Sequence, residues 1–255
     1  MPDEPVLTER RDRVLLITLN RPEARNAVNL ALAEGVAAAL DELDADGDLA
    51  VGVITGAGAG FCAGMDLKAF VTGERPWVGD RGFAGIVQRA SRKPLIAAIE
   101  GFAVAGGLEV ALACDLIVAA REAKLGIPEV KRSLVAAGGA LMRLPRRVPY
   151  GVAMELALTG DTITAERGYE LGLVNRLAES GAAVDAALKL AGAIARNGPL
   201  ALDATKAILQ QQFDWDEAEF WRRQGELSGP VFTSQDAREG AVAFSEKRDP
   251  VWQGR

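Results

Sequence analysis

Apolar residues in the first two thirds of the chain alternate between short unbroken runs and longer stretches of helical spacing. Short apolar runs between turn residues predict strands, here at residues 6–8, 14–20, 50–55, 94–100, 115–120 and 124–126. Helical spacing predicts helices at residues 30–43, 83–92, 136–147, 149–158 and 165–171. From residue 182 onward only helical spacing remains, at residues 182–196, 200–212, 215–227 and 235–246. We therefore expect an α/β core at residues 1–197 and a helical region at residues 198–255.

The stretch GFAVAGGLEVALACD, residues 101–115, follows a predicted strand and contains a Gly-Gly pair before an apolar helix. The first amides of a helix have no internal partner, so its start suits an oxygen that becomes negative. Glu109 comes three residues after Gly106 and therefore lies about one turn on, on the same side. This order indicates a donor site beside an acid or base. A tight turn with a solvated Glu109 is the alternative that this stretch alone leaves open.

A second glycine-rich stretch, GAGAGFCAGMDLKAF at residues 56–70, repeats the order of strand, small-residue loop and helix start. Its glycines do not have the spacing of a dinucleotide-binding fingerprint, because the third position falls on Phe61. We expect instead a helix that starts at Ala63 and Gly64, with amides free for a ligand.

A second isolated carboxylate, Glu129, follows Pro128 just after a predicted strand. Proline fixes the local turn and could set the direction of this side chain. Taken alone, Glu129 is more typical of an ordinary surface glutamate than of a catalytic group. The Gly-, Pro- and charge-rich segment at residues 72–82 predicts an exposed loop, either a plain surface loop or a lid over a substrate.

The composition narrows the classes of function. The chain has 255 residues, of which 49% are hydrophobic, which suits one large domain or one domain with an appendage. A formal net charge of -6 without a dominant basic cluster argues against nucleic-acid binding. No apolar run reaches membrane-spanning length, and the acidic N-terminus does not resemble a signal peptide. A cytoplasmic protein that binds neither nucleic acid nor membrane is therefore expected.

The chain contains no histidine. This excludes Ser-His-Asp and Cys-His catalysis and histidine-ligated metal sites. Two cysteines, Cys62 and Cys114, make no disulfide framework, and both are expected to be small buried residues. Proton transfer would fall to Asp, Glu, Lys, Cys or Tyr, and a carboxylate can serve at neutral pH if burial raises its pKa.

The chain resembles the enoyl-CoA hydratase/isomerase, or crotonase, family over essentially its whole length. The motifs that carry the resemblance are NRPEARNAVN (20–29), FCAGMDL (61–67), GFAVAGGLEVALACD (101–115), LGIPEV (125–130), AGG (137–139) and FSEKRDPVW (244–252). The resemblance implies a spiral of ββα units and C-terminal helices that form a trimer or a dimer of trimers. It also implies an acyl-CoA thioester substrate, with neither a metal nor a separate cofactor.

The family's site residues carry over to particular positions of this chain. The resemblance implies an oxyanion hole made by the backbone amides of Ala63 and Gly106, which would hold the thioester oxygen as it gains charge. Glu109 and Glu129 match the two glutamates of the hydratases, and the presence of both favours addition of water to a 2-trans-enoyl-CoA. Glu129 would then donate the proton to the α-carbon, and Glu109 would hold the water as a base.

The resemblance also implies contacts with substrate and water. Arg25 and Lys68 would lie along the pantetheine and phosphate path, and Phe244 and Lys247 would reach the adenine end of a neighbouring subunit's CoA. Ala137 stands in a segment that departs from the usual Pro-Gly-Ala-Gly-Gly of hydratases, and its amide could still touch the water.

Three alternatives to enoyl-CoA hydration remain at this level. The C-terminal EKRDPVW and the segment Phe83-Ala84-Gly85 are similar to carnitinyl-CoA dehydratases, which act on crotonobetainyl-CoA, and an aromatic wall at Trp77 would suit its trimethylammonium group. An isomerase would move a 3-enoyl double bond. A non-catalytic acyl-CoA-binding protein could use the same fold without needing both glutamates.

Overall fold

The computed structural model describes residues 4–255. Its main sheet has six strands in the order β1-β2-β3-β6-β8-β11. β1 and β2 form an antiparallel hairpin, and every later pairing in this sheet is parallel. The strands are β1 (Val6–Arg11), β2 (Val14–Leu19), β3 (Val51–Gly56), β6 (Leu95–Ile99), β8 (Leu116–Ala120) and β11 (Arg176–Ala178).

Two smaller sheets lie beside the main one. The chain passes from the main sheet to a three-stranded sheet and back, since β7 follows β6 and β9 follows β8. Each repeat of this path contains one strand in each of the two sheets and a connecting segment. This is the arrangement expected of a spiral of ββα units. The strands are β7 (Phe102–Val104), β9 (Lys124–Gly126) and β10 (Ile163–Thr164), with β4 (Trp77–Val78) and β5 (Gly82–Phe83) forming a separate hairpin.

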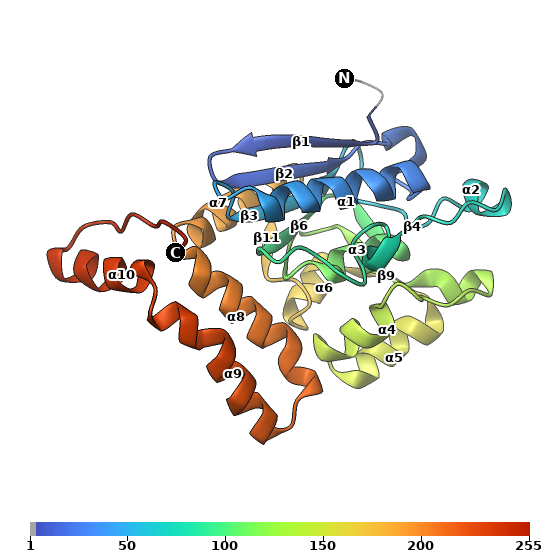
Figure 1. The fold of residues 1–255 in the computed structure, drawn as a ribbon. Helices are drawn as coiled ribbons and strands as arrows, with labels where there is room; N and C mark the ends of the chain where they lie inside the picture. Colours follow the sequence, from blue (N-terminus) through green and yellow to red (C-terminus); the bar gives the residue numbers. More distant parts are fainter. Residues whose placement is uncertain (1–3) are drawn as a thin grey trace.

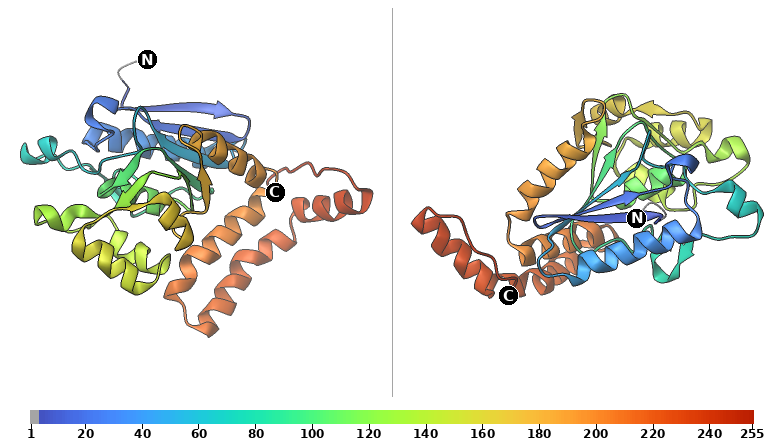
Figure 2. Two further views of the ribbon diagram at one scale, coloured as in Figure 1. Left: turned by 180° about the vertical axis from the view of Figure 1, so that it is seen from behind. Right: turned by 90° about the horizontal axis from the view of Figure 1, so that it is seen from above.

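Helices cover the sheets and continue beyond them (Figures 1 and 2). The α-helices are α1 (Leu30–Ala45), α2 (Leu67–Val71), α3 (Gly106–Ala113), α4 (Ala140–Arg143), α5 (Tyr150–Thr159), α6 (Ala165–Glu170), α7 (Ala183–Ala195), α8 (Pro199–Gln211), α9 (Glu217–Phe232) and α10 (Gln235–Glu246). Short 3-10 helices are η1 (Pro22–Ala24), η2 (Gly79–Arg81), η3 (Pro128–Arg132), η4 (Leu144–Arg146) and η5 (Gln212–Asp214).

Both faces of the main sheet are buried. Successive side chains of a strand point to opposite faces. In β2, Leu15 and Ile17 belong to the larger apolar cluster together with Leu40 of α1, whereas Leu16 joins a smaller cluster with Leu190 of α7. Burial on both faces explains why these strands are continuous apolar runs in the sequence.

Helices α8, α9 and α10 extend away from this body (Figures 1 and 2). α9 buries none of its residues, and the apolar side chains of Trp221, Phe232 and Phe244 are 62%, 79% and 87% exposed. The helical C-terminal region is therefore present as predicted, and it carries apolar surface that a single chain does not cover. Between residues 4 and 255, no helix combines the length and the apolar character that crossing a bilayer requires.

Three predicted helices differ in the structure. The helix predicted at residues 136–147 begins only at Ala140, as α4, and continues as the 3-10 helix η4. The helix predicted at residues 83–92 does not form, because Ala84 and Gly85 have positive φ angles of 55° and 68° and the chain turns away from β5. The helix predicted to start at Ala63 and Gly64 begins only at Leu67. Asp66 caps it by accepting hydrogen bonds from the next backbone amides.

Candidate active site

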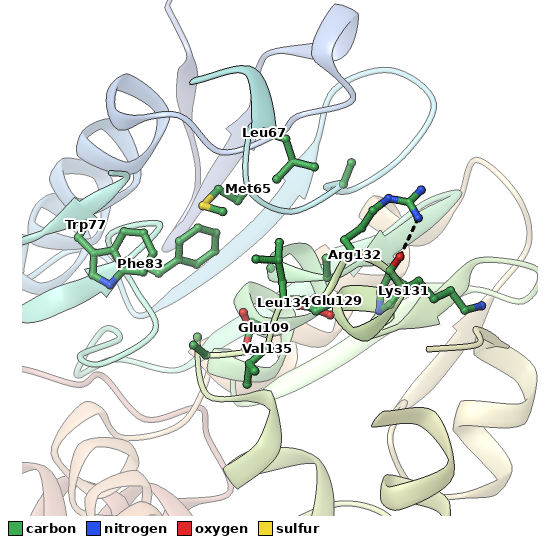
Figure 3. A pocket seen from close by; sticks show the side chains of 16 residues that line it. Met65, Leu67, Trp77, Phe83, Glu109, Glu129, Lys131, Arg132, Leu134 and Val135 are labelled. Carbon is green, nitrogen blue, oxygen red and sulfur yellow. Dashed lines mark hydrogen bonds between the residues drawn. The ribbon is translucent and has the colours of Figure 1, made fainter. Parts of the chain in front are cut away.

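One cavity of about 310 Å³ lies where α3, η3 and the β4–β5 hairpin meet (Figure 3). Its walls are mainly apolar, and two carboxylates are the acidic groups among the residues that line it. The lining residues are Ala63, Met65, Leu67, Trp77, Phe83, Ala105, Gly106, Glu109, Pro128, Glu129, Lys131, Arg132, Leu134, Val135, Ala137 and Gly138. An apolar cavity with a few convergent polar groups is the usual form of a small-molecule site.

Glu109 is held on α3, all of whose residues are buried, and is itself only 4% exposed. Its Oε1 accepts a hydrogen bond of 3.1 Å from the Ala140 amide. Burial, assisted by the nearby charge of Glu129, raises the pKa of Glu109 to about 7 against the opposing effect of the Ala140 and Gly138 amides. A carboxylate poised near neutral pH is suited to accept or donate a proton.

Glu129 reaches the same cavity from η3, which starts at Pro128. Burial raises the pKa of Glu129 above its ordinary value. Its Oε2 is buried and has no hydrogen-bond partner among residues 4–255. A buried acceptor without a protein partner is costly, so a ligand or a water molecule that donates to it would be favoured. The structure thus brings the two predicted glutamates to one cavity.

The amide of Gly106 is the first of α3 and has no acceptor within the helix. The amide of Ala63, predicted as its companion, is already used, because it donates a 3.1 Å hydrogen bond to the carbonyl oxygen of Arg25. The assignment of Ala63 as an oxyanion donor is therefore wrong.

Met65 supplies the second free amide. Val28 bonds to the chain on both sides of Met65: its amide donates to the Gly64 oxygen at 2.7 Å, and its oxygen accepts from the Asp66 amide at 2.9 Å. The Met65 amide lies between these bonds and has no acceptor within residues 4–255. A Cβ placed on Gly64 would lie 2.9 Å from the Gly106 nitrogen. The two free amides consequently come from segments in close contact.

The remaining predicted residues are spread more widely. Ala137 lines the cavity, as expected. Lys68 is exposed on α2, directly after Leu67 of the cavity wall, and Arg25 is exposed with its carbonyl oxygen bonded to Ala63. Phe244 and Lys247 belong to α10 and its end, on the opposite side of the molecule from the β4–β5 hairpin (Figure 1), so they do not reach this cavity within one chain.

Sequence reasoning missed several residues that shape the site. A Cβ on Gly138 would lie 2.4 Å from Glu109 Oε2, so only glycine lets this segment approach the carboxylate. Arg143 of α4 donates to the Gly138 carbonyl at 3.4 Å and to the Val87 carbonyl at 2.5 Å, and so braces the same segment. The Gly138-Gly139 pair before a predicted helix is a sequence signal for the close approach to Glu109. The sequence contains no comparable signal for the role of Arg143.

Both cysteines are buried and free, as predicted, and Cys62 donates to the Asn26 carbonyl. Burial raises the pKa of the Cys62 thiol to about 12, which argues against a nucleophilic role. Within the described part of the chain, no cluster of three or more Cys, Asp or Glu side chains could hold a metal ion.

Comparisons with known proteins identify the family and the fold of this chain. The sequence model of the enoyl-CoA hydratase/isomerase family matches residues 9–255. An enoyl-CoA hydratase of Mycobacterium tuberculosis is 43% identical, covering 98% of this chain and 96% of the relative. A carnitinyl-CoA dehydratase of Salmonella paratyphi A is 40% identical, covering 96% and 97%. The crystal structure of an enoyl-CoA hydratase from M. tuberculosis H37Rv superposes with a TM-score of 0.97 at 58% identity, covering 99% and 100% of the two chains.

Proposed function

Because this chain belongs to the enoyl-CoA hydratase/isomerase family, we propose that it adds water across the 2-trans double bond of an acyl-CoA thioester. The observation that carries the proposal is the meeting of Glu109 and Glu129 in one cavity beside the unpaired amides of Met65 and Gly106. These are the groups that hydration needs: an acid, a base and two donors for a developing negative oxygen.

The two amides would bind the thioester carbonyl oxygen. As the oxygen nucleophile adds at the β-carbon, the π electrons move onto this carbonyl, and the enolate oxygen becomes negative. The amides of Met65 and Gly106 belong to backbone segments in close contact, so these donors would need little reorganisation. The loss of one such donor typically costs about 3–4 kcal/mol of transition-state stabilisation. The α3 dipole adds to the effect, since its positive end lies at Gly106.

The two carboxylates would divide the proton transfers. Glu109 accepts one proton from the water whose oxygen bonds to the β-carbon, and Glu129 gives one proton to the α-carbon. The pair therefore carries one proton in total, and the proton left on Glu109 returns to Glu129 before the next cycle. The pKa of about 7 for Glu109 suits this exchange near neutral pH, and burial raises the pKa of Glu129 in the same direction. The amide of Ala137 would also contact the water.

The remainder of the substrate would be held outside the cavity. Arg25 and Lys68 are proposed to lie along the pantetheine and phosphates, where cations are favoured. Phe244 and Lys247 are proposed to reach the adenine of a neighbouring subunit's CoA in a trimer or a dimer of trimers. The exposed apolar residues of α9 and α10 support such an assembly.

Carnitinyl-CoA dehydration is the second candidate, because a relative with that name is 40% identical over almost the whole chain. Isomerisation and simple acyl-CoA binding have less support, since neither explains why the buried Glu109 and the half-buried Glu129 share one cavity.

The direct test is incubation of the purified protein with crotonyl-CoA while the enoyl absorbance is followed. Crotonobetainyl-CoA and a 3-enoyl-CoA are assayed in parallel. Hydration of crotonyl-CoA supports the proposal. Turnover of crotonobetainyl-CoA alone favours the second candidate, and conversion of only the 3-enoyl-CoA favours an isomerase.

A further inference from the structure

The cavity has two chemically different ends. Figure 3 places Trp77 and Phe83 on one side and Arg132 on the other, with Met65, Glu109 and Glu129 between them. Arg132 is exposed, and its Nη1 donates a 3.2 Å hydrogen bond to the Lys131 carbonyl oxygen (Figure 3). Phosphate groups of CoA are attracted to exposed cations. If the proposed function holds, the acyl group must then extend in the other direction, toward the aromatic end.

The aromatic end is formed by a matched pair of rings. Trp77 of β4 and Phe83 of β5 lie directly opposite each other in the hairpin register, so their side chains share one face. The rings pack edge to face, with centroids 5.3 Å apart. Phe83 is 4% exposed and Trp77 is 44% exposed, so Phe83 is the inner and Trp77 the outer part of the wall.

Phe83 also touches the proposed oxyanion site. A Cβ placed on Gly106 would lie 2.7 Å from Cε1 and Cζ of the Phe83 ring. The wall therefore begins next to the amide that is proposed to bind the thioester oxygen. Both rings line the cavity on the side next to this amide, and their apolar surface would face the acyl group.

The hairpin is fixed to α1 rather than free at the surface. Arg81, between the two strands, is only 2% exposed. It donates to Asp41 of α1 at 2.5 Å and to the Arg89 carbonyl at 2.9 Å. Behind the hairpin, Gly85 approaches α1 so closely that a Cβ there would lie 2.2 Å from the Ala33 carbonyl oxygen. A buried charged residue is costly unless it is paired, so this anchor resists displacement.

We propose that the Trp77–Phe83 pair, anchored to α1 through Arg81, is the wall that limits the acyl group and selects short enoyl chains. The inference rests on the proposed function for the identity of the substrate. It assigns residues 77–83 as a fixed wall, where the sequence left open a plain loop or a mobile lid.

The test compares kcat/KM for straight-chain 2-trans-enoyl-CoAs from crotonyl-CoA to decenoyl-CoA. In the unaltered enzyme, kcat/KM should fall by roughly tenfold or more between the short and long ends of the series. Trp77→Ala should remove most of this preference, whereas Trp77→Phe, which keeps a ring, should retain it. Arg81→Met keeps both the Trp77 and the Phe83 ring and should weaken the preference by loosening the hairpin. Tyr169→Ala, an exposed aromatic away from the cavity, is the matched control and should keep the original profile.

A chain-length preference that is the same in Trp77→Ala and in the unaltered enzyme would overturn the wall. A binding measurement separates this result from a failure of the proposed function. Saturated acyl-CoAs from butyryl-CoA to decanoyl-CoA are titrated by calorimetry, which requires no hydration. Affinity should decline with length in the unaltered protein and not in Trp77→Ala. If no enoyl-CoA is hydrated, the proposed function fails and the calorimetry alone decides on the wall. An affinity that rises steadily with acyl-chain length in the unaltered protein would contradict the proposed wall.

Discussion

Gly138 lies so close to Glu109 that a Cβ on the glycine would meet the carboxylate oxygen Oε2 at 2.4 Å. The segment that precedes α4 therefore covers the carboxylate tightly, and the amides of Gly138 and Ala140 are directed toward it. The position of Glu109, the proposed base, is therefore restricted both by α3, which carries it, and by this contact with Gly138.

Replacement of Gly138 by alanine should displace Glu109 or the segment around it. Because the clash is with the working carboxylate, we expect kcat for crotonyl-CoA to fall by roughly 10²-fold, the range for a misplaced catalytic group. Gly151→Ala is the matched control, since a Cβ there meets nothing within 4 Å. An unchanged kcat in Gly138→Ala, with the fold intact by circular dichroism, would show that this contact does not position the carboxylate.

The buried Glu109 should make the protein less stable at alkaline than at acidic pH. Its folded-state pKa of about 7 is higher than in the unfolded chain, so the folded protein binds this proton more tightly. The associated stability is fully present below the unfolded pKa, near 4.5, and is lost as the pH rises through about 7. The difference amounts to about 3 kcal/mol at most.

Glu109→Gln should remove this dependence. At pH 8 the variant should be more stable to urea than the unaltered protein, by up to about 3 kcal/mol, and the two should converge near pH 4.5. Glu155→Gln, an exposed position, serves as the control. Equal urea midpoints for Glu109→Gln and the unaltered protein at pH 8 would refute the raised pKa.

The choice of Met65 over Ala63 as oxyanion donor can be tested on the backbone itself. Incorporation of a 2-hydroxy acid in place of Met65 replaces its N–H by an ester oxygen, and kcat should then fall by about 10²–10³-fold. The same replacement at Ala63 breaks only the bond to Arg25 and should cost about 1 kcal/mol of stability. A larger loss of kcat at Ala63 than at Met65 would reverse the assignment.

Much of this architecture follows from local patterns. The strands buried on both faces are continuous apolar runs, and α10 (Gln235–Glu246) matches its predicted range. Glu109 stands out because a carboxylate on an apolar helix is costly to bury unless it is paired or used, whereas Glu129 gains significance only from the family resemblance. Their meeting in one cavity was expected from the family resemblance, and the structure places both there.

The predictions that were wrong or missing share a physical cause. Each of these features depends on contacts with residues that are distant in the sequence. Which amide of residues 63–65 is free depends on hydrogen bonds with residues 25 and 28. The absence of a helix after Phe83 depends on Gly85 packing against the backbone of α1. β7, β10 and β11 are two- or three-residue strands that form only by pairing with strands elsewhere in the sequence. The hydrophobic periodicity of a short sequence segment contains no information about these contacts with distant residues.

The central claim is that Glu109 and Glu129 act together on one water. The most direct measurement is crotonyl-CoA hydration by Glu129→Gln, with butyryl-CoA binding measured on the same preparation. We predict that binding persists while kcat falls by at least about 10²-fold, the usual contribution of a positioned acid or base. A variant that binds butyryl-CoA and hydrates crotonyl-CoA at the original rate would contradict the account.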